Sequence, residues 1–502
     1  MTESSLDRAI GPASATLLVI GGVIGSGIFL TTGVMAQILP SPSLILLAWA
    51  AGCLFALTGA LTYAELGTMF PRSGGVYVFL SEAFGPLVGF LYGWASLLVV
   101  LSGGIAAVAI GFADTFSYFV PALSSARIIV VVPVAGGLTI AAHQLVAVGS
   151  ILFLGAINAS GVRSGSRTNA VLTVAKVTGL LLIVLFAVTS SRAVPAWTPI
   201  VPAEVASPLA AFGVAVIAVL WAAEGYYFLT YAAGEIRDPA RTLPRALVIG
   251  LTAIALIYLA ANLAYVYALP MAELRGATRV AERSATALVG PVGATIVTLT
   301  VLVSTLGANA AVMLSGSRVL YAMAERGLFF ASAAAVHPRF RTPHVAVMLL
   351  TLWSSLLALS GTYEQLFTYV VFTSVIFSLL GGLALFRLRF TRPAANRPYR
   401  VWGYPLVPAA FVTSALVLAV NTVTQRPRQS LAGLGLLVLG LPAYFYWKRR
   451  SGRPGPGSDR LNDEGGSAAA RRGPRGPSSP VHPESAAWTG RRSRPRERRG
   501  GG

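Results

Sequence analysis

Stretches of roughly 20 or more mainly apolar residues recur along this chain between Ala13 and Trp447, and each is long enough to cross a lipid bilayer as a helix. Of the 502 residues, 55% are hydrophobic and only 11% are charged. Charged residues make up about 25% of a typical soluble domain. The pattern therefore predicts an all-α, polytopic membrane protein and argues against a soluble enzyme.

Twelve membrane-spanning helices are expected, and together they form one transmembrane domain at residues 13–448. The fourth segment is long enough to hold an extracellular piece before a span that starts near His143. The first helix lacks the basic region and cleavage site of a signal peptide and is expected to stay in the membrane. The predicted helices lie at about 13–38, 43–68, 78–116, 128–160, 169–190, 209–233, 244–268, 291–323, 343–361, 365–388, 404–424 and 430–447.

The net charge of +20 indicates orientation in a membrane rather than binding to nucleic acid. Twelve spans put both termini on one side, whose loops and N-terminus hold 16 arginines against seven in the opposite loops. Because cytoplasmic loops carry the excess of basic residues, residues 1–12 and both termini are expected in the cytoplasm and the protein in the cell membrane. Residues 449–502 are rich in Gly, Pro, Ser and Arg, which predicts a disordered basic tail, either solvated or in contact with membrane lipid.

The first span is interrupted in its middle by glycine. Residues 21–33 read GGVIGSGIFLTTG, in which Gly25 and Gly27 flank Ser26 between two apolar stretches. Glycine weakens a helix, and lipid tolerates a broken backbone only inside protein or beside water. A half-helix that starts at Ile28 would present free N–H groups, which suit a carboxylate. Taken alone, the stretch is equally compatible with a small-residue packing face.

A second interruption lies in the sixth span, five helices after the first. Trp221 is followed by two alanines and then by Glu224 and Gly225, which puts a carboxylate near the middle of the membrane. Such a carboxylate is costly unless it is paired, neutralised or hydrated. Matching breaks in two halves indicate a transporter built from inverted repeats, with its substrate between the breaks. The repeats are expected at about 13–190 and 209–388, with two extra helices at about 404–447.

An ordered set of motifs resembles the amino acid–polyamine–organocation superfamily of permeases, and within it bacterial relatives of the L-type amino-acid transporters. The resemblance covers roughly residues 10–448. Each motif alone is weak, but the set in this order is specific. Besides residues 21–33, the motifs are YAELGTMFPRSGGVYVFLSEAFGPLVGFLYGW at 63–94, INASGVRSGSRTNAVLTVAKVTGLLLIV at 157–184, AAGEIRDPARTLPRAL at 232–247, SGSRVLYAMAERGLFF at 315–330 and RPYRVWGYPLVPA at 397–409.

The resemblance implies a LeuT-type fold that works by alternating access. It implies that the substrate carboxylate binds backbone N–H groups of the first break and that the substrate amine binds carbonyl oxygens beside both breaks. Trp221 corresponds to an aromatic residue that closes over the substrate, although ordinary helix packing is the alternative. The residues implied for the carboxylate are Gly25, Ser26 and Gly27, and those for the amine and the second break are Val23, Ile24, Trp221, Ala222, Glu224 and Gly225.

The chain holds only two lysines, Lys176 and Lys448, beside 36 arginines. Lys176 lies in the middle of the fifth span, where a cation is costly. The resemblance places it beside the first break, where sodium-coupled relatives of the fold hold their ion, and so implies a sodium-independent carrier. Burial also favours loss of the lysine proton, which keeps proton coupling open. The alternative is a side chain that extends to the membrane surface.

Three interpretations of Glu224 stay open. It lines the pocket and favours small polar or cationic side chains, it titrates during transport, or it pairs with a neighbouring donor. Together with the bulky Tyr226, it would fill space that a large hydrophobic substrate needs. Asn309 is a weak candidate for the site, because it lies one position, or about 100° around a helix, from the asparagine that relatives often carry. Glu65, and Glu235 with Arg237, are interpreted as structural or cytoplasmic-gate charges that are solvated or salt-bridged rather than in contact with substrate.

These features predict a secondary active transporter of L-amino acids, by sodium-independent exchange or by proton-coupled uptake of small or polar neutral substrates. A carrier of cationic amino acids or polyamines is the first alternative, and an amino-acid sensor that signals through its tail is the second. Neither a cofactor nor a metal is expected, because the sequence shows no phosphate loop, nucleophile–base pair or metal-ligand spacing. The only cysteine, Cys53, lies within a span, so no disulfide-linked partner subunit is expected.

Overall fold

The computed structural model of the protein describes residues 8–132, 138–189, 197, 200, 201, 203, 205–223, 225–361, 363–425 and 427–451. All of them belong to one compact unit, Met1–Ser451, whereas Gly452–Gly502 form a second unit. The predicted disordered tail therefore falls outside the described residues, apart from its first few positions.

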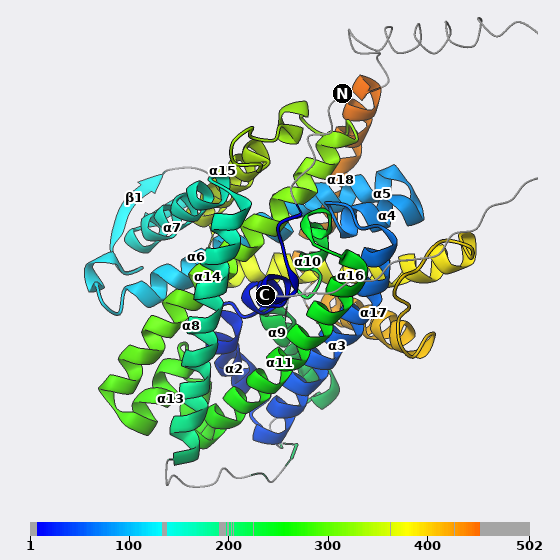
Figure 1. Ribbon diagram of the computed structural model, residues 1–502. Coiled ribbons are helices and arrows are strands. Elements are labelled where there is room, and N and C mark those ends of the chain that lie inside the picture. Colours follow the sequence, from blue (N-terminus) through cyan, green and yellow to red (C-terminus); the bar gives the residue numbers. More distant parts are fainter. Residues whose placement is uncertain are drawn as a thin grey trace, which may run out of the picture. The chain divides into compact units, whose positions relative to one another are not determined.

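Helices make up most of the described chain (Figure 1). The elements in chain order are α1 (Pro12–Val23), α2 (Gly27–Ile38), α3 (Pro42–Met69), α4 (Val76–Phe84), α5 (Pro86–Ala95), the π-helical turn η1 (Ser96–Val100), α6 (Leu101–Phe116), η2 (Pro121–Leu123), β1 (Ile128–Val132), β2 (Leu138–Ala141), α7 (Ala142–Ala159), α8 (Val162–Thr189), α9 (Pro208–Ala223), α10 (Phe228–Tyr231), η3 (Ala233–Glu235), α11 (Pro239–Ala268), α12 (Met271–Arg275), α13 (Val280–Val289), α14 (Pro291–Glu325), η4 (Ala331–Ala334), α15 (His344–Ser360), α16 (Tyr363–Thr391), α17 (Leu406–Gln425) and α18 (Pro427–Ser451).

Within the described residues, nine helical segments are long and apolar enough to cross a membrane, with α1 and α2 counted together and likewise α5 to α6. Two shorter apolar helices, α9 and α15, add to them. A polytopic helical membrane protein is thereby confirmed. The total of twelve spans and the inverted relation between the two repeats stay predictions.

The prediction of one helix over residues 128–160 is wrong for its first part. Strands β1 and β2 form an antiparallel pair there, with Val132 opposite Leu138 and Ile128 opposite Ala141. The run Ile-Ile-Val-Val-Val consists of β-branched residues, which favour strands over helices. The alternative start near His143 is confirmed, because α7 begins at Ala142.

Three other predicted helices differ clearly in their boundaries. The one expected at 169–190 begins at Val162 as α8. The segment at 78–116 is divided, because Gly85 has a positive φ of 95° and Pro86 opens a new helix. Helix α11 begins at Pro239 rather than near residue 244, since a proline in the first helical turn loses no hydrogen bond.

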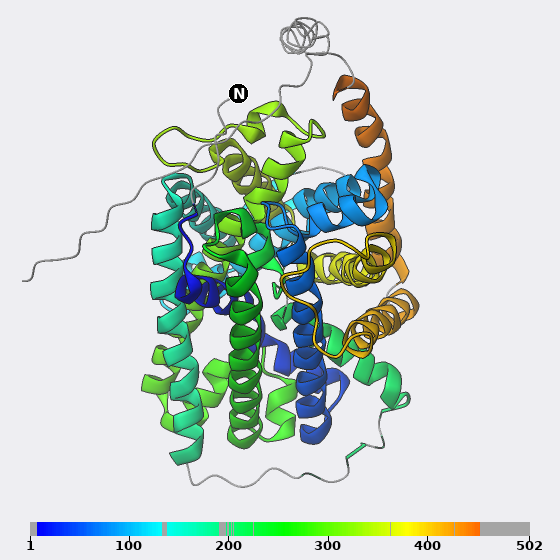
Figure 2. The ribbon, with the colours of Figure 1, turned by 45° about the vertical axis from the view of Figure 1, so that its right-hand side comes forward.

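The broken first span lies among helices from distant parts of the sequence (Figures 1 and 2). Helix α1 packs against α8, α11 and α14, and α2 packs against α9, α12 and α13. Helix α9 also packs against α3 and α17. This arrangement buries both interrupted segments, where protein groups rather than lipid surround the freed backbone.

Candidate functional site

The first predicted break is present. Helix α1 ends at Val23, Ile24 has extended backbone angles (φ −73°, ψ 94°), and α2 begins at Gly27 with Ser26 as its N-cap. The first N–H groups of a helix have no acceptor within that helix, and the helix dipole makes this end positive. All residues of the break are buried, so these donors can serve a buried anion.

The second predicted break is also present. Helix α9 ends at Ala223 and α10 begins at Phe228. Gly225 has φ +103°, in the region that favours glycine, and this lets the chain turn between the two helices. Glu224 lies outside the described residues, so its three interpretations stay open.

The two breaks touch one another. A Cβ atom added to Gly27 would lie 2.6 Å from both Cα and Cβ of Ala222, so only glycine fits at this contact. Tyr258 of α11 contacts both broken segments through its hydroxyl group. Its hydroxyl lies 2.8 Å from the Ala222 carbonyl oxygen and 3.2 Å from that of Val23, within hydrogen-bond distance of both.

Replacement of Gly27 by alanine is expected to impair both folding and transport. The added methyl group forces the two breaks apart, and overpacking of this kind costs about 1–3 kcal/mol. Thermal unfolding of the purified protein and initial rates of amino-acid exchange measure the effect. Gly149→Ala in α7 is the matched control, because its Cβ meets nothing within 4 Å. Equal behaviour of the two variants would contradict the tight contact.

Lys176 of α8 also contacts the first break. Its side chain is fully buried, and Nζ lies 2.7 Å from the Gly21 carbonyl oxygen and 2.5 Å from that of Ile24. Ser304 of α14 donates from Oγ to the carbonyl oxygens of Ile24 (3.2 Å) and Gly25 (3.1 Å). The alternative in which Lys176 extends to the membrane surface is therefore wrong. The ammonium instead bonds to the carbonyl groups that the break frees.

A cavity of about 50 Å³ opens beside both breaks. Five of the predicted site residues line it: Val23, Gly25, Ser26, Gly27 and Trp221. Ile24, Ala222 and Gly225 are described but do not line it, and the carbonyl groups of Ile24 and Ala222 face Lys176 and Tyr258. The other lining residues come from α1, η1, α6, α10, α14 and α16: Gly22, Val100, Gly104, Val108, Phe228, Ala308, Asn309, Val312 and Val370.

Two predictions about neighbouring side chains need correction. Asn309 lines the cavity, although it was a weak candidate. Tyr226 is buried but points elsewhere, since its hydroxyl hydrogen-bonds to Ser378 Oγ at 2.7 Å and its ring packs on Phe55 and Phe411. Phe228, which follows two residues later, lines the cavity instead.

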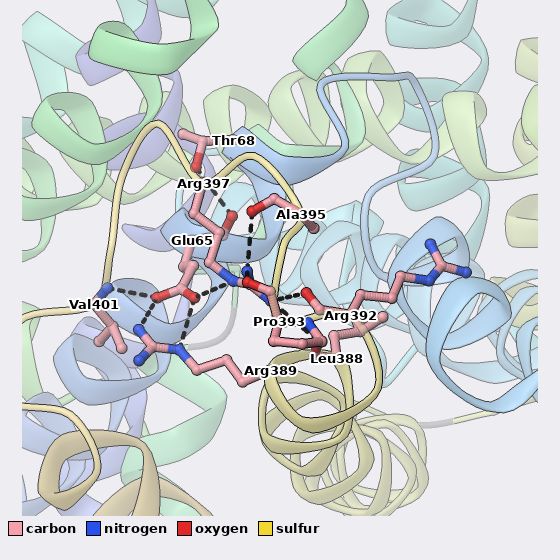
Figure 3. Close-up of polar contacts among 9 residues, drawn as sticks. All are labelled: Glu65, Thr68, Leu388, Arg389, Arg392, Pro393, Ala395, Arg397 and Val401. Atoms are coloured by element: carbon pink, nitrogen blue, oxygen red, sulfur yellow. Dashed lines mark hydrogen bonds and ion pairs between the residues drawn. The ribbon is translucent and has the colours of Figure 1, made fainter.

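Of the two roles expected for Glu65, solvated or salt-bridged, the structure has the salt bridge, and Figure 3 shows the groups around it. Glu65 of α3 is fully buried and binds Arg389 of α16 through two contacts of 2.6 and 2.9 Å. The backbone N–H of Val401 donates to the same carboxylate at 2.6 Å, and Arg397 Nε lies 3.4 Å away. The connection between α16 and α17 is thus fixed to the end of α3.

Two further carboxylates at this end of the helices pair with arginines. Glu235 binds Arg318 of α14 through Nε (2.6 Å) and Nη2 (3.0 Å), and both side chains are fully buried. Arg237, the other charge expected at this position, donates to the Arg8 carbonyl oxygen.

Glu82 of α4 contacts three arginines: Arg72, Arg326 and Arg392. Burial on its own would raise the pKa of Glu82. The hydrogen bond from Arg392 and the charges of the three arginines outweigh burial and hold this pKa below its ordinary value.

The sequence gives no indication of Tyr258 or Ser304, and it makes Asn309 only a weak candidate. All three act on the breaks or the cavity from helices far along the chain, and no glycine or charge marks them. Of the described residues, none of the His, Cys, Asp and Glu side chains form a group that could hold a metal ion.

Comparison with known proteins agrees with this geometry. The family model described as amino acid permease matches residues 10–439. The serine/threonine exchanger SteT of Bacillus subtilis (strain 168) is 30% identical over 461 residues, which cover 89% of this chain and 98% of that protein. Large neutral amino acids transporter small subunit 2 of Mus musculus is 30% identical, with 89% of this chain and 82% of that protein covered. The b(0,+)-type amino acid transporter 1 of Mus musculus is 29% identical, with 90% and 92% covered. The chain belongs to the amino acid permease family.

Proposed function

We propose that this protein is a sodium-independent transporter that exchanges small or polar neutral L-amino acids by alternating access. The observation that carries the proposal is the cavity beside the two helix breaks, with the start of α2 at its wall. A similar protein that exchanges serine and threonine supports the substrate class.

In this proposal the substrate carboxylate binds the N–H groups of Gly25, Ser26 and Gly27, where the positive end of α2 stabilises an anion. The substrate amine binds carbonyl oxygens beside the breaks. Trp221 covers the bound amino acid from α9. A substrate bound beside both breaks is exposed first to one side of the membrane and then to the other as the helices that carry the breaks move relative to one another.

In this mechanism the ammonium group of Lys176 replaces a bound metal cation. Its ammonium holds the carbonyl oxygens of Gly21 and Ile24, which would otherwise suit a metal cation. This contact ties α8 to the first break without any ion from solution. Sodium independence follows from it.

The test is counterflow in proteoliposomes with a panel of twenty amino acids, with and without sodium and a pH gradient. Exchange of serine, threonine and alanine in the absence of sodium is expected. Strong competition of serine uptake by arginine or putrescine, with none by alanine or threonine, would instead establish a carrier of cations. If no amino acid exchanges but the purified protein binds them, the sensor alternative is favoured, and deletion of residues 451–502 then tests whether signalling needs the tail.

The membrane, the topology and the partners belong to the same proposal. The excess of arginine in loops on one side supports a cell-membrane location with both termini in the cytoplasm. One relative is named a small subunit, which indicates a larger partner for that protein. For this chain we propose no disulfide-linked partner, because its one cysteine, Cys53, is 7% exposed within α3.

A further inference from the structure

The amide of Asn309 has a fixed orientation in the cavity. Its Nδ2 donates to the Ile105 carbonyl oxygen of α6 at 3.1 Å. That carbonyl can only accept a hydrogen bond, so the NH2 group must face it and the amide oxygen must face away. Asn309 is 2% exposed, and its Oδ1 has no hydrogen-bond partner among the described residues.

A buried acceptor without a partner is unusual, because most buried polar atoms in proteins are hydrogen-bonded. Of the described lining residues that η1, α6, α14 and α16 contribute, Asn309 is the polar one, and the others are valine, alanine and glycine. Residues of the first break and Trp221 line the same small cavity. An amino acid held at the breaks by its backbone groups therefore shares this cavity with the Asn309 amide.

We propose that Asn309 Oδ1 accepts a hydrogen bond from the side-chain hydroxyl of the substrate, so that the protein prefers serine to alanine and threonine to valine. The proposal rests on the proposed function, in which the breaks hold the carboxylate and the amine. Serine and alanine differ by this hydroxyl alone, whereas threonine and valine have nearly the same shape. A carbonyl oxygen cannot donate, so a substrate without a donor leaves Oδ1 unpaired and binds more weakly.

The experiment measures KM and maximal rate for serine, alanine, threonine and valine by exchange in proteoliposomes. The unaltered protein is expected to favour serine over alanine and threonine over valine by about five- to tenfold in kcat/KM. Asn309→Leu is expected to reduce both preferences to near one, while alanine exchange persists. Asn158→Leu is the matched control. Asn158 of α7 is also a buried asparagine that donates to a helix carbonyl (Leu154, 2.9 Å) and has an unpartnered Oδ1, but it does not line the cavity.

The possible results of this experiment distinguish the role of Asn309 from the proposed exchange function on which it rests. An unaltered protein that exchanges all four amino acids without preference overturns the role of Asn309, even if the leucine variant fails to fold. Retained preferences in Asn309→Leu overturn it as well. Equal loss for all four substrates in a variant that elutes as a folded protein shows that Oδ1 serves a group common to every amino acid, and also overturns it. Absence of any amino-acid exchange by the unaltered protein contradicts the proposed function itself.

Discussion

Lys176→Ala is expected to reduce amino-acid exchange by about tenfold or more. The ammonium is the donor to the Gly21 carbonyl oxygen and shares that of Ile24 with Ser304. Without it, a buried carbonyl group at the first break loses its donor, which costs about 1–3 kcal/mol, and 1.4 kcal/mol corresponds to about tenfold. The break then no longer keeps the geometry that binds the carboxylate. Counterflow of serine in proteoliposomes measures the loss.

Lys448→Ala provides the matched control, because it removes the only other lysine from an exposed position near the end of α18. Its exchange rate is expected to equal that of the unaltered protein. Gel filtration establishes that both variants are folded. A folded Lys176→Ala protein that exchanges serine at the normal rate would refute the role given to this lysine.

Arg318→Met is expected to produce the largest loss of stability. Arg318 and Glu235 are both fully buried, so removal of the arginine leaves a carboxylate without a counter-charge. Removal of one partner of such a pair costs about 3–5 kcal/mol. Thermal unfolding of the purified protein in detergent should show a clear fall in the midpoint temperature. The double variant Arg318→Met/Glu235→Leu is expected to recover much of the loss, since it leaves no unpaired charge.

An exposed ion pair supplies the comparison. Arg241 and Asp238 lie 3.9 Å apart with side chains 76% and 60% exposed, and such pairs contribute about 0–1 kcal/mol. Arg241→Met should therefore leave the unfolding temperature almost unchanged. Similar shifts for Arg241→Met and Arg318→Met, or a double variant less stable than Arg318→Met, would contradict the argument from burial.

Much of the first break could be predicted because its signal is local. Gly25 and Gly27 interrupt an apolar stretch, and a membrane has no water to satisfy the freed backbone. The buried contact of Lys176 could be predicted in the same way, because a lysine in the middle of a span needs a buried partner. Both predictions rest on the cost of polar groups in lipid, which a sequence displays without knowledge of the fold.

The parts that could not be predicted depend on how helices rotate against one another. Tyr258 reaches both breaks from α11, yet nothing around it in the sequence marks it among 17 tyrosines. By sequence, Asn309 lies about 100° around the helix from the expected position, but in the fold, where α14 packs against α6, it lines the cavity. The β-branched residues of β1 favour a strand that pairs with β2. The apolar character of the whole segment, however, equally fits a membrane-spanning helix.

The scarcity of lysine gives this protein a built-in chemical reporter. An amine-reactive reagent meets Lys448 at the surface at once, whereas it reaches Lys176 only when α8 separates from α1. The ratio of modification at the two peptides, read by mass spectrometry, therefore measures how often the first break is exposed to solvent. A substrate that holds the break closed should slow the reaction at Lys176 and leave that at Lys448 unaltered, so the transport cycle can be timed without any label being engineered into the chain.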